Sequence, residues 1–415
     1  MEQVHLALAV TGAVVLLLGL FSGTVRKLPF ITRPIAALVV GAVLGPAVTG
    51  VVQPSRWTMS PESLLEELAR ITLGIALVSV AMRLPPGYVR RRWRSLLTVL
   101  LLVMPLMWVS TGLVLWLLGG LPIWLALLLG AILTPTDPVV AGTIVTGDVA
   151  EKNLPPRLRH LITAESGAND GLAHPLVFAS ILLIAPASHG TASEWIVEYV
   201  LKDVVATIAF GIALGYAVGW IMTHIEGDEI SIKGAPFVAY AVALSLTVLG
   251  GAELMGMNGV LAVFVAGVAF NDSVKGSQRT TVDVVEQAVN QFFILPIFIF
   301  LGFAAPWHEW TRIGWRAPAV AIAVLLFRRI PVLALTGRLI PAVEGKRDRL
   351  FVGWFGPVGI AAVYYAAVAE RHLQDPRIWP FASLVIITSI FAHSLTATPL
   401  TRRYGRMTEH DRTEE

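Results

Sequence analysis

Long apolar stretches recur along the whole chain and are separated by short polar segments. Most are roughly 18 to 25 residues long, about the length that a helix needs to cross the hydrocarbon core of a membrane. We predict thirteen spanning helices, over residues 4–22, 30–52, 63–83, 95–119, 121–146, 156–185, 196–223, 235–251, 256–271, 284–304, 314–338, 350–370 and 378–400. The pattern leaves no room for a soluble domain and predicts an all-α membrane protein, with one transmembrane domain over 1–400 and a short cytoplasmic tail over 401–415.

The composition supports this interpretation, because 55% of the residues are hydrophobic and only 14% are charged. One soluble core could not bury so much apolar surface, so the surplus must face lipid. Cysteine is absent, which excludes disulfides and thiolate metal sites. The first apolar stretch follows "MEQVH", which has no basic segment, so we expect a retained helix and not a signal peptide.

Basic residues predict the orientation, because short cytoplasmic loops collect Lys and Arg. If the C-terminus is cytoplasmic, the inward loops hold most of the 31 Lys and Arg residues, including the run from Arg90 to Arg94 and the group from Lys346 to Arg349. The outward loops keep only a few, among them Arg56 and Arg371. The expected orientation therefore has the N-terminus outside and the C-terminus in the cytoplasm.

Two predicted spans carry helix breakers near their centres, "GAILTPTDPVVAGTIV" at 130–145 and "VGWFGPVGIAAVYYAA" at 352–367. Proline removes a backbone donor and glycine relaxes the backbone, so both segments should unwind inside the membrane. The first is the fifth span of the chain and the second is the fifth of the last six. Matched broken helices are typical of inverted-repeat transporters, in which the substrate site lies where they cross. Kinks without transport are the alternative, since Pro and Gly are common in membrane helices.

Ionisable side chains lie within the apolar stretches at Asp137, Glu165, Asp170, Arg328 and Arg329. Each costs about 2.5–3.5 kcal/mol at the bilayer centre, so such residues usually face the protein interior and have a function there. One of the two arginines should pair with an acid. We favour Glu165 with Arg329, and expect the other arginine to face a loop or the C-terminus of a half-helix.

The sixth span places several oxygen-bearing side chains on one broad helical stripe. Ser166 and Asp170 are four residues apart, as are Glu165 and Asn169. Oxygen ligands with some negative charge suit a hard monovalent cation, although a structural hydrogen-bond network between helices is the alternative. His174, one turn after Asp170, is better explained as a buried histidine bonded to a neighbour than as a pH sensor.

The segment "TPTDP" can complete the set of oxygen ligands. Unwinding there should free the carbonyls of Thr134, Pro135 and Thr136, together with the Thr136 hydroxyl. Asp137 followed by Pro138 also reads as an ordinary helix N-cap with Pro at the first helical position.

The motifs "TPTDPVVA", "AEKNLPPRLRHLITAESGANDG", "LFRRIPVLAL" and "GWFGPVGIAAVYYAA" together resemble the monovalent cation/proton antiporters of the NhaP type, most closely the branch of the fungal plasma-membrane sodium/proton antiporters. The resemblance implies thirteen helices in an NhaA-like antiporter fold. A core bundle, here around 95–185 and 314–400, would move in an elevator-like way against a dimerisation scaffold.

The resemblance also implies roles for single residues. Asp170 would bind the cation and the proton in turn, and the other cation ligands would be Asp137, Thr136 and Ser166. Asn169 would hold the crossing, while Glu165 with Arg328 or Arg329 would balance charge. The chain departs from many bacterial members at Val358, where they carry Arg. With residues 401–415 alone after the last predicted span, we expect no regulation through the long cytosolic tail that animal and fungal exchangers carry.

From these residues we expect a secondary sodium/proton antiporter in which Na⁺ and H⁺ compete for Asp170. Li⁺ and K⁺ are further candidate cations, and a potassium-selective antiporter or a cation channel is the alternative. An intramembrane hydrolase is less favoured, because the "YD" and "GxGD" signatures are absent. We expect a homodimer in the lipid bilayer of the plasma membrane, acting in pH homeostasis, with no cofactor, no enzymatic reaction and no nucleic-acid partner.

Overall fold

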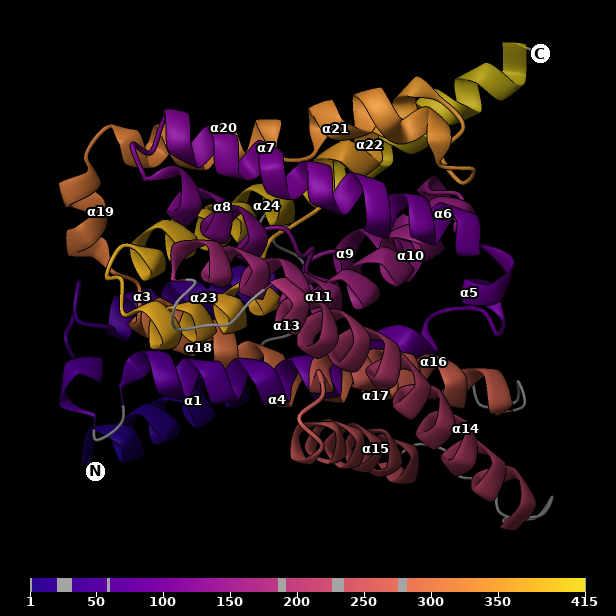
Figure 1. The fold of residues 1–415 in the computed structure, drawn as a ribbon, viewed down its shortest axis with the longest axis horizontal. Coiled ribbons are helices and arrows are strands. Elements are labelled where there is room, and N and C mark those ends of the chain that lie inside the picture. Colours follow the sequence, from indigo (N-terminus) through magenta and orange to yellow (C-terminus); the bar gives the residue numbers. More distant parts are fainter. Residues whose placement is uncertain are drawn as a thin grey trace.

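The computed structural model describes residues 2–20, 32–57, 60–185, 192–225, 235–274 and 282–414. Within these ranges the regular elements are all helices, and Figure 1 shows the N- and C-termini at opposite ends of the bundle. The predicted all-α fold is confirmed. We call the end that carries the C-terminus, α5 and α10 the inner end, and the end that carries α19 the outer end.

The first part of the chain runs from the N-terminus to the long helix α11. Its elements are α1 (Glu2–Leu20), α3 (Arg33–Leu44), the 3₁₀ turn η1 (Pro54–Arg56), α4 (Pro61–Met82), α5 (Tyr88–Arg91), α6 (Trp93–Thr98), the π-helical η2 (Val99–Val103), α7 (Met104–Leu117), α8 (Ile123–Ile132), α9 (Gly142–Val145), α10 (Gly147–Asn153) and α11 (Pro156–Ile184).

The second part contains two further π-helical segments, η3 and η5. Its elements are α13 (Ala192–Trp195), η3 (Ile196–Ala206), α14 (Thr207–Ile225), α15 (Ala235–Leu254), α16 (Gly259–Ser273), α17 (Val282–Val289), η5 (Asn290–Ile294), α18 (Leu295–Phe303), α19 (Trp307–Ile313), α20 (Arg316–Phe327), α21 (Ile330–Thr336), the 3₁₀ turn η6 (Gly337–Leu339), α22 (Lys346–Trp354), α23 (Ile360–Leu373) and α24 (Ile378–Glu414).

Each predicted span overlaps at least one of these helices. Among the described residues, 7 helices are long and apolar enough to cross a membrane, and shorter apolar helices accompany them. The number of spans stays a prediction, and segments such as 21–31 lie outside the described residues. The prediction of a helix over 30–52 is too long, because α3 ends at Leu44. Pro46 follows there and biases Gly45 toward extended backbone.

Both predicted interruptions are present. Helix α8 ends at Ile132 and α9 begins only at Gly142, while α22 ends at Trp354 and α23 begins at Ile360. The intervening residues 133–141 and 355–359 form turns and extended backbone inside the bundle. Unwound backbone at this depth needs polar partners, which are described in the next section.

A third interruption lies in the predicted span 314–338, which we expected to be one helix. Helix α20 ends at Phe327 and α21 begins at Ile330, so Arg328 and Arg329 occupy the junction. Pro331 has no N–H to donate to the Phe327 carbonyl four residues earlier. The Ser110 hydroxyl donates to that carbonyl instead, at 2.7 Å. The junction lets the two adjacent arginines reach different partners.

Candidate functional site

Asp137 joins the two main interruptions. Its backbone N–H donates to the Pro357 carbonyl at 2.7 Å, and its Oδ2 accepts from the Ile360 N–H at 2.7 Å. Its Oδ1 accepts from the N–H groups of Val139 and Val140 at 2.7 and 2.9 Å. The carboxylate therefore caps its own turn and also the start of α23, where helix dipoles favour negative charge. This geometry supports the interpretation of Asp137 as a helix cap. Its role as a cation ligand stays a prediction.

Asp170 lies in the middle of α11 and is fully buried. Among the described residues, neither of its carboxyl oxygens has a hydrogen-bond partner. It lies within the range of direct electrostatic interaction with Asp137. The side chain therefore points into the protein and not into lipid, and it is a buried acid without a fixed partner.

A hydrogen-bonded cluster connects α11 to the first interruption. The Thr136 hydroxyl lies 2.9 Å from the Ser166 hydroxyl and accepts from the Asn169 amide at 2.9 Å. The Thr136 N–H donates to the Asn169 Oδ1 at 3.1 Å. The structure thus brings together Thr136, Ser166 and Asn169, as expected, and Asn169 holds the unwound backbone at Thr136.

The two arginines have different partners, as expected: one pairs with an acid, and the other faces the C-terminus of a half-helix. Arg329 donates to both carboxylate oxygens of Glu165, with an Nη2 to Oε2 distance of 2.8 Å, and both side chains are almost fully buried. Arg328 donates to the carbonyls of the α8 C-terminus, at 2.5 Å for Leu133, and to the carbonyl of Gly356. It therefore neutralises the carbonyl ends at both interruptions.

This arrangement corrects one expectation about the cation ligands. The carbonyls of Thr134 and Pro135 were predicted to point into the crossing as free ligands. They lie 3.3 and 3.4 Å from Nη1 of Arg328 and accept hydrogen bonds from it. The Arg328 guanidinium thus lies where a cation bound to these carbonyls would lie.

Two polar residues beside Asp170 were not predicted. Pro175 lies inside α11 and leaves the Gly171 carbonyl without its helical donor. The Asn258 amide donates to this carbonyl at 2.8 Å, and the Tyr365 hydroxyl donates to the Asp170 carbonyl at 2.6 Å. The available signal was Pro175, whose missing N–H predicts that another donor must reach Gly171.

His174 also has a partner that we did not foresee. Its Nε2 lies 3.2 Å from Oδ2 of Asp203, a buried carboxylate in η3, and its ring lies 4.5 Å from that of Phe178. This contact agrees with the structural explanation for His174. His393 is likewise bonded, with its two ring nitrogens within 3.0 Å of Ser389 and of the Trp354 carbonyl.

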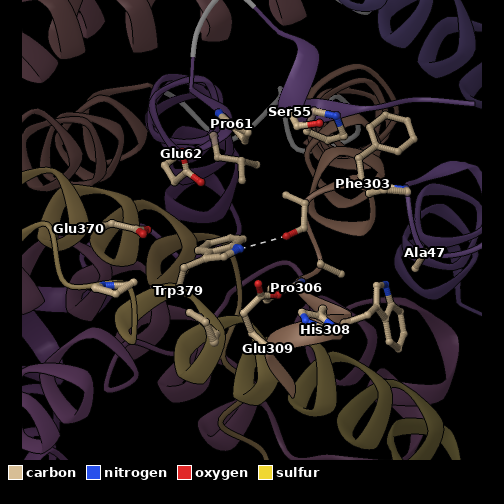
Figure 2. A pocket seen from close by; sticks show the side chains of 18 residues that line it. Ala47, Ser55, Pro61, Glu62, Phe303, Pro306, His308, Glu309, Glu370 and Trp379 are labelled. Carbon is tan, nitrogen blue, oxygen red and sulfur yellow. Dashed lines mark hydrogen bonds between the residues drawn. The ribbon is translucent and has the colours of Figure 1, made fainter. Parts of the chain in front are cut away.

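Cavities lie at both ends of the described bundle. At the inner end, a cavity of about 360 Å³ reaches Thr163 on α11, about two helical turns before Asp170. A larger cavity of about 590 Å³ lies at the outer end, between the α3–α4 and α18–α19 connections and the α23–α24 connection, and contains none of the predicted site residues. Figure 2 shows its carboxylates Glu62, Glu309 and Glu370 beside Trp379.

Residues of the predicted inward loops line the first cavity, and residues of the predicted outward loops line the second. The alternation of the loops is thus consistent with the fold, while the side that faces the cytoplasm stays a prediction.

Comparison with known proteins adds an independent observation. A family model described as "Sodium/hydrogen exchanger, transmembrane" matches residues 12–403. A Na(+)/H(+) antiporter of Schizosaccharomyces pombe is 30% identical over 420 residues, which cover 95% of this chain and 90% of that protein. A Na(+)/H(+) antiporter of Saccharomyces cerevisiae is 32% identical over 432 residues, which cover 96% of this chain but 44% of that protein. The chain spans about half the length of several curated relatives that it matches.

The fold also matches a solved structure. The sodium proton antiporter MjNhaP1 from Methanocaldococcus jannaschii superimposes with a TM-score of 0.74 at 19% sequence identity, over 98% of each chain. At this identity the match shows a shared fold, in agreement with the expected antiporter architecture.

Proposed function

The chain belongs to the sodium/hydrogen exchanger family as a multi-pass integral membrane protein, and we propose that it exchanges Na⁺ for H⁺ at Asp170. The fungal relatives are named for this exchange. Within this chain, the observation that carries the proposal is the state of Asp170, fully buried and without a hydrogen bond among the described residues.

The other charged groups at the crossing are compensated. Glu165 pairs with Arg329, Arg328 is bonded to four carbonyls, and Asp137 accepts three backbone N–H groups. An ionised carboxylate without a partner is strongly disfavoured in a dry interior. Asp170 is therefore the group at which an ion from solution is needed, and either a proton or a metal cation meets that need.

The oxygen atoms around Asp170 suit a small monovalent cation. We assign the hydroxyls of Ser166 and Thr136, together with Asp137, as its other ligands. Asn169 holds the Thr136 backbone in place. Because the Asp137 oxygens already accept backbone N–H groups, its contribution is mainly its negative charge, which also opposes the empty, ionised form of Asp170.

The coupling of cation and proton transport depends on which forms of Asp170 can move between the two sides of the membrane. If only the protonated and the cation-bound forms carry Asp170 between the two sides, each cation that moves one way is balanced by a proton that returns. One titrating carboxylate favours exchange of one Na⁺ for one H⁺ without ATP. In this proposal, a core formed by residues 95–185 and 314–400 moves against the remaining helices. The protein acts as a homodimer in the plasma membrane.

The test is proton flux in proteoliposomes that carry a pH gradient, after addition of Na⁺, Li⁺ or K⁺. We expect Na⁺ to dissipate the gradient, and the relative affinities of the three cations decide the selectivity. Asp170→Asn should abolish the flux, while Asp148→Asn, at an exposed position of α10, should not. Normal exchange by folded Asp170→Asn protein would disprove the assignment, and current without coupling to the pH gradient would indicate a channel.

A further inference from the structure

The inner end of the bundle holds two cavities that share residues. The cavity of about 360 Å³ is lined by Arg83, Glu286, Thr146 and Thr163, and a second cavity of about 200 Å³ is lined by Glu286, Thr146 and Val139. The first cavity reaches Thr163 on α11, on the inner side of the site, and the second reaches the segment that follows Asp137. Glu286 and Thr146 therefore face both cavities through which an ion could approach the crossing.

Arg83 and Glu286 form an ion pair between these cavities. Arg83 is the C-cap of α4, and its Nη2 lies 3.0 Å from Oε1 of Glu286 on α17. The side chains are only 10% and 18% exposed. The Nη1 of Arg83 also donates to the carbonyl of Pro138, at 3.3 Å. The guanidinium thus contacts the residue next to Asp137, at the inner side of the crossing.

The charge at this position matters for a cation. Arg83 by itself would place a positive charge between the solvent and Asp170, in a recess with little water to screen it. Arg159 and His160 also line the first cavity, and Arg33 lines the second one. Arg159 lies about three helical turns before Asp170 on α11 and contacts Glu151 at 3.4 Å. The charge of Arg83 is balanced by Glu286 alone among the described residues within ion-pair distance of it.

We propose that Glu286 is a determinant of cation affinity, because it neutralises Arg83 at the inner entrance to the site. Arg83 in turn holds the Pro138 carbonyl, and Glu286 allows it to do so without repelling the transported cation. This inference rests on the proposed function, which assigns the site itself to Asp170.

The first test separates charge from structure by kinetics. Glu286→Gln keeps a hydrogen-bond acceptor for Arg83 but leaves its charge unbalanced, so the apparent KM for Na⁺ should rise about two- to tenfold with little change in Vmax. Arg83→Gln combined with Glu286→Gln should return the KM close to the wild-type value. The KM increase should shrink at high ionic strength. Glu151→Gln, at the exposed lip of the same cavity, is the matched control and should leave the KM unchanged.

The second test does not depend on transport. The chain has no cysteine, so Thr146→Cys introduces a single thiol that faces both cavities. This thiol is modified with two methanethiosulfonate reagents of similar size, one that carries a positive trimethylammonium group and one that carries a negative sulfonate group. The ratio of the two modification rates reports the local electrostatic potential. Glu286→Gln should lower the ratio of the cationic to the anionic rate severalfold, and the double variant should restore it.

An unchanged KM and an unchanged labelling ratio in folded Glu286→Gln protein would overturn the inference. A double variant that fails to recover either quantity would do the same, because the effect of Glu286→Gln would then not come from the unbalanced charge of Arg83. If the wild-type chain shows no exchange at all, the proposed function fails, and the labelling ratios still decide whether Glu286 sets the potential.

Discussion

The carboxylate of Asp137 accepts a hydrogen bond of 2.7 Å from the backbone N–H of Ile360, although the two residues are 223 positions apart. This contact joins the two interrupted helices at their unwound segments. It depends on Gly359, since a Cβ atom at that position would lie 1.9 Å from Oδ2 of Asp137. The crossing therefore requires an acid on one segment and a residue without a side chain on the other.

Gly359→Ala should disrupt the crossing. The added methyl must displace the Asp137 carboxylate, and overpacking of this kind costs about 1–3 kcal/mol or more. We expect a lower thermal midpoint in detergent and loss of exchange in proteoliposomes. Gly250→Ala is the matched control, because a Cβ there meets nothing within 4 Å. Equal behaviour of the two variants would show that the contact of Asp137 with Ile360 is dispensable.

Glu165 and Arg329 should behave as a coupled pair in stability measurements. Glu165→Gln alone leaves a buried guanidinium without its counter-charge, and breaking such a pair costs about 3–5 kcal/mol. The double variant with Arg329→Gln removes both charges and should be less destabilised than the sum of the single changes. Unfolding of the four proteins in one detergent tests this. Additive single effects would mean that the pair contributes no coupling energy.

The side chain of Asn258 makes two contacts: its Oδ1 caps α16 by accepting from the Leu261 N–H at 3.0 Å, and its amide replaces the helical donor that Pro175 removes from the Gly171 carbonyl. Asn258→Ala in the wild-type background leaves the buried Gly171 carbonyl with only a 3.5 Å contact from Tyr365, at a cost of about 1–3 kcal/mol. In a Pro175→Ala background the restored N–H of residue 175 can bond that carbonyl, so the same change should cost less. An equal loss of unfolding free energy in both backgrounds would contradict this account of the kink.

Asp348 should make the inner end sensitive to acid. Burial raises the pKa of Asp348, but hydrogen bonds from Tyr404 and Arg157, both 2.5 Å long, outweigh it, so this pKa lies below its ordinary value. Because the pKa of Asp348 is lower in the folded than in the unfolded protein, its ionised form stabilises the fold. This contribution is fully present above the unfolded pKa of about 4 and is lost as the pH falls through the lower, folded pKa.

The wild-type protein should therefore exceed Asp348→Asn in unfolding free energy by a constant amount, about 1–3 kcal/mol, between pH 5 and 8. The difference should decline only below about pH 4. Thermal unfolding over this pH range measures it, with Asp148→Asn as an exposed control. A difference that changes between pH 6 and 8 would contradict the assignment to Asp348.

Much of the site could be predicted because charged residues within apolar stretches have few alternatives to an interior position. Asp137, Glu165, Asp170 and the two arginines were recognisable for this reason, as was the pairing of Glu165 with Arg329. The helix breaks at 133–141 and 355–359 were predictable from Pro and Gly. The buried charges and the helix breakers are local signals in the sequence, whereas the pairing of Glu165 with Arg329 was expected only because a buried arginine needs an acid as its partner.

The features that escaped prediction depend on tertiary contacts. The carbonyls of Thr134 and Pro135 could be predicted to lose their helical donors, but not that Arg328 would replace those donors. Asp203 lies close to Lys202 near the start of a predicted span, which is an ordinary position for charged residues. Its burial against His174 follows only from the packing of η3 on α11. The donors Asn258 and Tyr365 come from helices far away in the sequence.

The central claim is that Na⁺ and H⁺ replace each other on Asp170, and proton release on Na⁺ binding tests it most directly. Purified protein in weakly buffered detergent solution is titrated with Na⁺ while the bulk pH and the heat of binding are recorded. We predict about one proton released for each Na⁺ bound, with an apparent affinity that falls about tenfold per pH unit on the acid side, as one-for-one competition requires. Asp170→Asn should show neither binding nor release. Na⁺ binding without proton release by the wild type, or unchanged binding and release by Asp170→Asn, would contradict the account.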